Sequence, residues 1–289
     1  MDTIGQTELW SFLDGDDAAK TATNTEVRKG AGHRVESFLD LATKIAELQF
    51  RNRDHVLVFR GQRHDHRNHF GGNTTLKPSL LRPGRQSPSN PGEFRLTRRF
   101  EILREAEREL VRRFEERELL GMKRLKRQRI LRWAILQHYE VCHTPLLDVT
   151  HSLRIAASFA SIGAENKAYV FVLGVPNLSG AVTASAESGL QIIRLSSVCP
   201  PSAVRPHIQE GYLLGEYPEM AEFEQKENYK HYEVDFGRRL IAKFSFNPET
   251  FWKRDTFPRV SKMALYPDSS DPIFQLTEAV KNAIDTTEN

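Results

Sequence analysis

Hydrophobic residues recur at intervals of three and four positions in two long stretches of the chain. Between residues 35 and 48 this spacing predicts an amphipathic helix with one buried face. Between residues 96 and 114 most of the intervening positions are charged, so we expect a long helix with a charged outer surface. Shorter helices are predicted over residues 125–139, 151–163 and 271–284.

Continuous apolar runs of strand length mark a second kind of element. The runs "HVLVFRG", "LLDVT", "AYVFVLGV", "LQIIRL" and "RLIAKFSF" predict strands over residues 55–61, 146–150, 168–175, 190–195 and 239–246. Helices dominate the first half of this order, and strands with short helices dominate the second half. We therefore expect an α+β fold, in which a helical N-terminal part and the long charged helix pack on a mixed, mostly antiparallel sheet.

The start of the chain lacks both patterns. Residues 11–33 are small, polar and uneven in sequence, which predicts a loop. We expect residues 1–33 to form a poorly ordered or loosely packed N-terminal lead. Residues 34–289 would then form a single domain, a length that is sufficient to bury one large core.

Composition excludes several classes of protein. No run of about 18 apolar residues occurs, so no membrane-spanning helix is expected. The first residues lack the basic leader and apolar stretch of a secretory signal. The two cysteines, Cys142 and Cys199, form no CxxC pair, so neither a zinc site nor a disulfide framework is expected. A reducing cytoplasm is the expected location.

Charge is distributed unevenly along the chain. The formal net charge is +3, but residues 94–133 contain fourteen Lys or Arg against seven Asp or Glu. Such a concentration can bind phosphates through counterion release, so region 95–132 is a candidate surface for a nucleic acid or a protein target. The favoured interpretation is a solvated helix face with ion pairs between residues three or four positions apart.

The run "FRGQ" places Arg60 at the end of a hydrophobic strand. Arginine is rarely buried without a partner, because desolvating its charge is costly. A strand-end arginine that faces a cleft can hold a phosphate or a carboxylate with its rigid fork of donors. The other interpretation is an edge-strand arginine whose head lies in water.

A short histidine-rich run follows. His64, His66 and His69 have the donor atoms to ligate a metal together with Asp65. The region is loop-like, rich in arginine and free of cysteine, and short histidine-rich patterns are weak signals. We therefore expect these histidines at the surface and no metal site.

Two later motifs carry further polar residues. His138 in "QHYEV" is either an acid or base or a core histidine bonded to a carbonyl. In "LLDVT", Asp148 and Thr150 lie two positions apart and should share one strand face. A buried Asp148 needs donors, either the N–H groups of the following helix or an arginine such as Arg60. Thr150 would then lie where its hydroxyl can meet a ligand.

The order of these motifs resembles the FRG domain family, which is named for its F/Y-R-G motif. The matching pieces are "FRGQ", "PSLLR", "QHY", "LLDVT", "A-x-x-F-A" and an apolar strand, with weaker matches at "RPHIQEGYLL" and "ALYPD", over about residues 55–285. Glu140, Cys142, His143 and Val149 depart from the usual pattern and indicate a subgroup. The resemblance implies a bacterial or phage effector of the phage-defence or toxin type, with a cognate antitoxin or regulator as partner.

A looser resemblance is to ADP-ribosyltransferases with the R-S-E order. It implies NAD as the cofactor, Arg60 as the group that holds its phosphate or ribose, and Thr150 as the group that orients the nicotinamide ribose. Gln209 or Glu210 would occupy the catalytic position, where only a Glu210 that faces the cleft supplies a carboxylate to stabilise positive charge. The residues expected to contact the cofactor are Arg60, Gly61, Gln62, His138, Tyr139 and Asp148.

Alternatives to such an enzyme remain open at this point. One is a non-catalytic module that senses a nucleotide or a nucleic acid. The other is a structural role, in which Asp148 and Thr150 only tie a strand to a helix. No G-x-S-x-G elbow, HExxH motif, phosphate-cradling loop or dinucleotide fingerprint occurs, which disfavours a hydrolase or kinase of those types.

Overall fold

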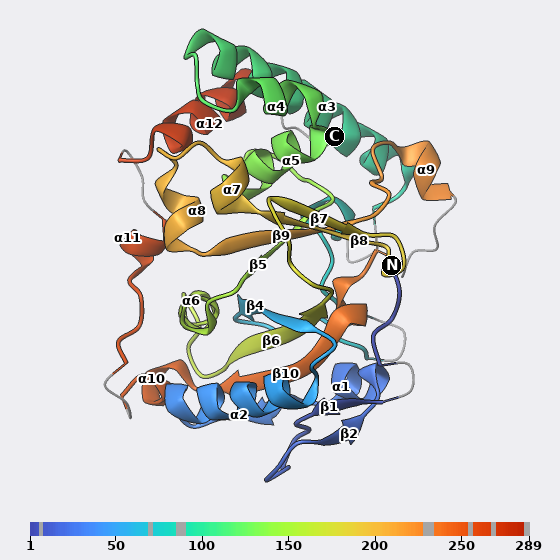
Figure 1. The fold of residues 1–289 in the computed structure, drawn as a ribbon, viewed down its shortest axis with the longest axis vertical. Helices are drawn as coiled ribbons and strands as arrows, with labels where there is room; N and C mark the ends of the chain where they lie inside the picture. Colours follow the sequence, from blue (N-terminus) through green and yellow to red (C-terminus); the bar gives the residue numbers. More distant parts are fainter. Residues whose placement is uncertain are drawn as a thin grey trace.

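A mixed eight-stranded sheet runs through the computed structural model, which describes residues 1–5, 8–68, 72–84, 91–227, 234–253, 257–266 and 270–285 (Figure 1). The strand order is β3-β10-β6-β4-β5-β9-β8-β7. Within the described residues, β3 and β10 pair in parallel and the other neighbours pair in antiparallel fashion. The expected α+β fold with a mixed, mostly antiparallel sheet is therefore confirmed.

The strands of this sheet match the predicted apolar runs closely. They are β3 (His33–Arg34), β4 (Val56–Gln62), β5 (Leu147–Thr150), β6 (Ala168–Val175), β7 (Val182–Ser185), β8 (Leu190–Arg194), β9 (Gly211–Glu216) and β10 (Leu240–Phe246). A separate two-stranded sheet consists of β1 (Leu9–Ser11) and β2 (Lys20–Ala22).

The sheet opens at its centre, between β4 and β5. These two strands pair only at Phe59 and Thr150, whereas β4 pairs with β6 along its whole length and β5 pairs with β9 along its whole length. The sheet therefore consists of two halves, β3-β10-β6-β4 and β5-β9-β8-β7. In Figure 1 these halves lie below and above the label of β5. The functional candidates lie along this opening.

Helices cover the two halves differently. The helices are α1 (Asn24–Lys29), α2 (Phe38–Arg51), α3 (Glu93–Glu116), α4 (Met122–Arg127), α5 (Arg129–His138), α6 (Leu153–Ala160), α7 (Leu195–Val198), α8 (Val204–Ile208), α9 (Phe223–Glu227), α10 (Pro248–Phe251), α11 (Lys262–Leu265) and α12 (Pro272–Ala283), with short 3-10 turns at Ser79–Leu81 and Phe236–Arg239. Figure 1 shows α1 and α2 at one end of the molecule and α3, α4, α5 and α12 at the other. No helix in the described part of the chain is long and apolar enough to cross a membrane.

The buried residues form two hydrophobic clusters, the first of which also includes Leu147 of β5, Ile192 of β8 and Leu214 of β9. The first cluster joins α2 and the N-terminal residues to β4, β6 and β10, and the second joins α3, α5 and α12 to β8 and β9. The predicted apolar face of α3 is buried at all of its positions, Leu96, Phe100, Leu103, Leu110 and Phe114. Asp271 caps α12 by accepting hydrogen bonds from the N–H groups of Ile273 and Phe274, as its place before Pro272 predicts.

The N-terminal residues differ from the expectation of a loosely packed lead. The region predicted as a loop, residues 11–33, contains the end of β1, all of β2 and α1, and the start of β3. Helix α1 begins with a capping box, in which Thr23 and Glu26 satisfy each other's backbone N–H groups. Phe12 is 2% exposed and its ring lies 6.0 Å from that of Phe244 in the large sheet. A few apolar side chains thus anchor a segment whose average composition is polar.

One predicted helix is divided in two. The pattern over residues 125–139 predicts a single helix, but Gln128 has an extended backbone, with φ −117° and ψ 105°, between α4 and α5. The apolar spacing continues across this break, so periodicity alone does not reveal it.

Candidate functional site

A cavity of about 510 Å³ lies where β4 and β5 separate. It is called the central cavity below. Strand β4 contributes Arg60 and Gln62, and β5 contributes Asp148 and Thr150. The end of α5 contributes Gln137 and His138. Residues from both halves of the sheet therefore meet in one space.

Arg60 lines the central cavity and is half-buried. Its Nη1 donates a hydrogen bond to the backbone carbonyl of Asp148, across the part of the sheet where β4 and β5 no longer pair. Its Nε is buried and has no hydrogen-bond partner among the described residues. Burial, and then the nearby charge of Arg82, lower the pKa of Arg60 to about 10, so the guanidinium is charged at neutral pH. A buried charge with a free donor suits an anionic ligand.

Gly61 has a packing role beside Arg60. A Cβ atom at this position would lie 1.8 Å from the backbone oxygen of Ala156 in α6. Only glycine lets α6 lie this close to β4. Gly61 and Gln62 both line the central cavity, and the buried Oε1 of Gln62 has no partner within the described part of the chain.

Asp148 is the centre of a polar network. Its Oδ2 accepts a hydrogen bond from Gln137 Nε2 at 2.7 Å, and its Oδ1 lies 3.4 Å from Nδ1 of His138. Burial acts to raise the pKa of Asp148, but the hydrogen bonds from His138 and Gln137 and the charge of Arg60 outweigh it, so the pKa lies below its ordinary value. Although 36% of its side-chain area is exposed, protein surrounds the carboxylate, because this area faces the cavity rather than open solvent.

His138 presents a free nitrogen at the central cavity. Its side chain is 2% exposed, and Nε2 is buried without a hydrogen-bond partner among the residues that the structure describes. When Nδ1 donates to Asp148, Nε2 carries a lone pair and can accept a proton. Burial lowers the pKa of His138, while the hydrogen bond with Asp148 opposes this shift. The ring is therefore neutral at neutral pH.

The other expected site residues have different positions. Tyr139 does not line the central cavity, and its hydroxyl donates to Asp271 at 2.7 Å. Thr150 does line the cavity, but its hydroxyl donates to the carbonyl of Gln209 at 2.7 Å and accepts from the N–H of Ser152. The Thr150 hydroxyl is therefore already engaged with the backbone.

The two late candidates do not lie on a strand. Gln209 and Glu210 follow α8 and precede β9. Gln209 lines the cavity, yet its Nε2 donates to the carbonyl of Leu265 at 2.6 Å. Glu210 has a left-handed backbone with φ 46°, is exposed and does not line the cavity. Arg60, Thr150 and Gln209 thus converge on one space, and Glu210 lies outside it.

Residues 55–168 match the family model described as FRG domain. Residues 55–168 therefore belong to the FRG domain family. The match extends from the residue before β4 to the first residue of β6, so it includes Arg60, His138, Asp148 and Thr150. Comparisons with curated proteins and with solved structures found no match.

Three residues that line the site were not predicted from the sequence. Glu140, Arg205 and Tyr266 line the central cavity. Arg205 donates to Glu140 at 2.8 Å, and its guanidinium lies 4.7 Å from the ring centre of Tyr266. The available signals were the "RPHIQEGYLL" and "ALYPD" matches, which contain Arg205 and Tyr266. Both residues come from outside the span of the family match.

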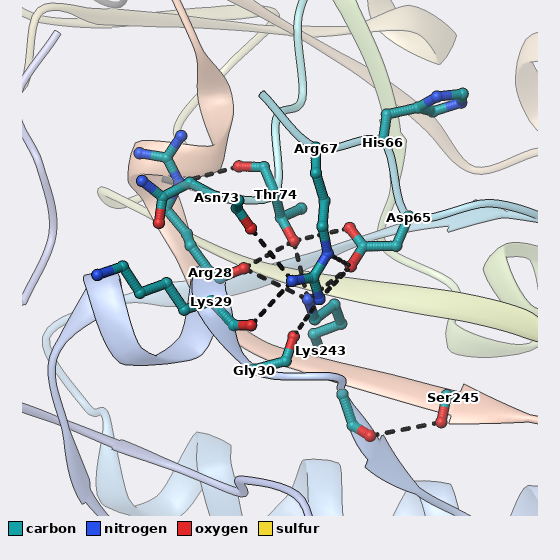
Figure 2. Close-up of polar contacts among 12 residues, drawn as sticks. Arg28, Lys29, Gly30, Asp65, His66, Arg67, Asn73, Thr74, Lys243 and Ser245 are labelled. Carbon is teal, nitrogen blue, oxygen red and sulfur yellow. Dashed lines mark hydrogen bonds and ion pairs between the residues drawn. The ribbon is translucent and has the colours of Figure 1, made fainter. Parts of the chain in front are cut away.

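The histidine-rich loop of the FRG domain borders the central cavity through His64 and His66. A buried network holds this loop (Figure 2), in which Lys243 of β10 donates to Asp65 and to Thr74, each at 2.8 Å. Arg67 donates to Asp65 at 2.9 Å. His69 lies outside the described residues. Within the described part of the chain, no group of three or more His, Cys, Asp or Glu residues could hold a metal.

Ion pairs occupy much of the basic region 95–132. Arg98 pairs with Glu101, both Arg112 and Arg113 pair with Glu109, and Arg132 pairs with Glu107. These contacts favour the interpretation of α3 as an ion-paired helix face. Binding of a nucleic acid or a protein target to this region stays a prediction.

Proposed function

We propose that this FRG domain binds NAD in the central cavity and acts as an ADP-ribosyltransferase-like effector that cleaves the bond to nicotinamide. The observation that carries the proposal is the buried, charged Arg60 with a free Nε beside the Asp148 carboxylate, at the opening of the sheet. The effector role, of the phage-defence or toxin type, is supported by the family resemblance.

The polar atoms of the cavity fit such a ligand. NAD combines a diphosphate with a positively charged nicotinamide ring, and the cavity offers Arg60 for the first and Asp148 for the second. Three buried polar atoms at the cavity lack partners among the described residues, namely Arg60 Nε, Gln62 Oε1 and His138 Nε2, and small side-chain movements on binding would let a ligand satisfy them. An apolar pair, Phe159 and Ile162, lines the same space and suits a flat ring.

The resident carboxylate of the cavity is Asp148 rather than Glu210. NAD, when bound, would supply a glycosidic bond whose cleavage builds positive charge on the ribose. A carboxylate fixed beside that charge stabilises it in a site that excludes water. The pKa of Asp148 is below its ordinary value, so the group is ionised at neutral pH, and Gln137 fixes its orientation. We assign to Asp148 the role that the R-S-E resemblance gave to Glu210.

The neutral His138 is placed to act as a base. Its Nδ1 faces Asp148, so its Nε2 carries the lone pair and would take a proton from water or from an acceptor hydroxyl once the ring turns toward the bound ligand. Asp148 would stabilise the resulting imidazolium, as a carboxylate partner does in other acid–base pairs.

A second candidate function uses the same cavity without chemistry. The hydroxyl of Thr150 is engaged with the backbone and Glu210 lies outside the cavity, so two of the residues expected for catalysis are not directed at a ligand. This favours a module that senses a nucleotide. Release of nicotinamide separates the two candidates.

The test measures binding and turnover on the same protein. Titration calorimetry with NAD and with ADP-ribose measures affinity, and chromatography measures nicotinamide released with and without cell extract as a source of acceptors. The enzyme proposal expects both binding and release. Binding without release of nicotinamide supports the sensor. If neither NAD nor ADP-ribose binds, both proposed functions are contradicted.

The pH dependence of turnover is expected to report His138. Burial lowers its pKa below the ordinary value of 6.5, so the rate should be level at neutral pH and fall as the pH drops through this lowered pKa. His138→Gln should reduce the rate by about 10²–10⁴-fold and leave NAD affinity within a few-fold. Rates measured between pH 4.5 and 8.5 check this.

The matched control is His207→Gln, because His207 is exposed and does not line the central cavity. Its profile should equal that of the parent protein. A His138→Gln protein that keeps the full rate and the same acidic decline would exclude His138 as the base.

A further inference from the structure

A second cavity, called the side chamber below, adjoins the central cavity and has a volume of about 830 Å³. Arg60, Gln137, Glu140 and Asp148 line both spaces, so these residues form the wall between them. The remaining lining of the side chamber includes Ser79, Arg82, Arg99, His143 and Lys281. A group held in the side chamber therefore lies against the same Arg60 and Asp148 that face the central cavity.

The charges that remain available in the side chamber are positive. Its two carboxylates are compensated by arginines, because Asp148 lies near the charge of Arg60 and Glu140 pairs with Arg205 at 2.8 Å. Arg82 uses its Nε to donate to the carbonyl of Lys77 at 2.8 Å, and its terminal nitrogens have no partner among the described residues. The available charge is therefore cationic.

Lys281 adds a second available cation. Its Nζ lies 3.9 Å from Glu278, the outer limit of an ion pair, and 44% of its side-chain area is exposed. A pair that is this long and exposed contributes little and is easily exchanged for another anion.

Arg82 faces the chamber rather than open solvent. Its residue area is exposed, yet surrounding protein lowers its pKa. Both observations agree if the exposed area is turned into the chamber that Arg82 lines. Arg82 thus lies at the edge of this space, where surrounding protein strengthens an ion pair relative to a fully solvated surface.

The wall that carries Arg82 is fixed before any ligand binds. The buried guanidinium of Arg99 donates to the carbonyls of Leu80 and Arg82 at 2.6 and 2.9 Å. The N–H of Leu80 donates to the carbonyl of Thr144 at 3.1 Å, which ties this turn to the segment after α5. A site that is already ordered loses less free energy on binding.

We propose that the side chamber binds the terminal phosphate of a nucleotide or nucleic-acid ligand. Phosphate matches the chemistry, because its oxygens accept paired hydrogen bonds from Arg82 and its charge is balanced by Lys281 and Arg60. This binding does not depend on NAD turnover. Its use rests on the proposed function, in which the phosphate would anchor the acceptor beside Arg60 and Asp148, the residues shared with the NAD cavity.

The test compares probes that differ only by a phosphate, in the full chain and without NAD. AMP should bind and adenosine should bind at least about tenfold more weakly, which is the loss expected for hydrogen bonds to a charged group. Arg82→Ala should weaken AMP binding by about tenfold or more, and Lys281→Ala by a smaller factor. Arg117→Ala is the control, because Arg117 is exposed and lines neither cavity.

A short oligonucleotide with and without a 5′-phosphate identifies the source of the phosphate. Tighter binding than AMP that depends on both the 5′-phosphate and Arg82 indicates a nucleic-acid end, and binding no tighter than AMP indicates a free nucleotide. Equal affinities for AMP and adenosine, or unchanged AMP affinity in a folded Arg82→Ala protein, would overturn the proposal. If the protein binds AMP through Arg82 but never releases nicotinamide, the phosphate site is supported and the proposed enzymatic function is contradicted.

Discussion

Replacing Arg60 with alanine is expected to weaken NAD binding by about a hundredfold and to abolish nicotinamide release. Hydrogen bonds to a charged group contribute about 1.5–3 kcal/mol each, and a hundredfold change in affinity corresponds to about 2.7 kcal/mol. Loss of the guanidinium also leaves the Asp148 carbonyl without the hydrogen bond that spans the opening of the sheet. Calorimetry and the nicotinamide assay measure the two effects separately.

Two further variants make the result specific. Arg60→Lys keeps the charge but loses the planar fork, so intermediate affinity is expected. Arg53→Ala is the control, because Arg53 is exposed and its Nε donates only to a nearby backbone carbonyl, that of Phe50. If a folded Arg60→Ala protein binds NAD with the parent affinity, Arg60 does not hold the ligand and the central cavity is not the NAD site.

The strands and long helices could be predicted because their signal is local. Strand β6 coincides with the apolar run over residues 168–175, and α3 contains the predicted helix with its buried face. The N-terminal segment could not be predicted in the same way. Its order depends on Phe12 and a few other side chains that pack on β10, a partner more than 200 residues away in the sequence.

The same distinction between local signals and distant contacts applies to the residues of the candidate site. Arg60 and Asp148 were predictable, because a charged residue in an apolar strand must have a partner or a ligand. The position of Glu210 was not, because the left-handed backbone at this residue directs the chain from α8 into β9. Tyr139 is adjacent to His138, but its hydroxyl is fixed by Asp271, 132 residues later. Contacts between distant segments decide which neighbour faces the cavity.

Asp65→Asn is expected to lower the free energy of unfolding by about 3–5 kcal/mol, because it leaves a buried lysine without its counter-ion. The side chains of Lys243 and Asp65 are 1% and 6% exposed, and their charged atoms lie 2.8 Å apart (Figure 2). Urea denaturation measures the change. The histidine-rich loop should open first, because Asp65 joins it to Lys243 of β10 and to Thr74.

The pH dependence of this variant separates a charge effect from lost packing. Burial lowers the pKa of Lys243, and Asp65 opposes that shift, so Asp65→Asn should lower it further. The unfolded chain then binds more protons than the folded protein, and stability should rise with pH toward the ordinary lysine pKa of 10.5.

The double variant Asp65→Leu with Lys243→Met should recover much of the lost stability, since neither charge remains buried. The surface control Asp54→Asn should stay within about 0.5 kcal/mol of the parent protein. If the Asp65→Asn protein unfolds like this control at every pH, the hydrogen bonds of the Lys243 ammonium to Thr74 and to the backbone are sufficient to stabilise it without a counter-ion. The loop bearing His64 and His66 would then be held by Arg67, which bonds to the carbonyls of Lys29 and Gly30.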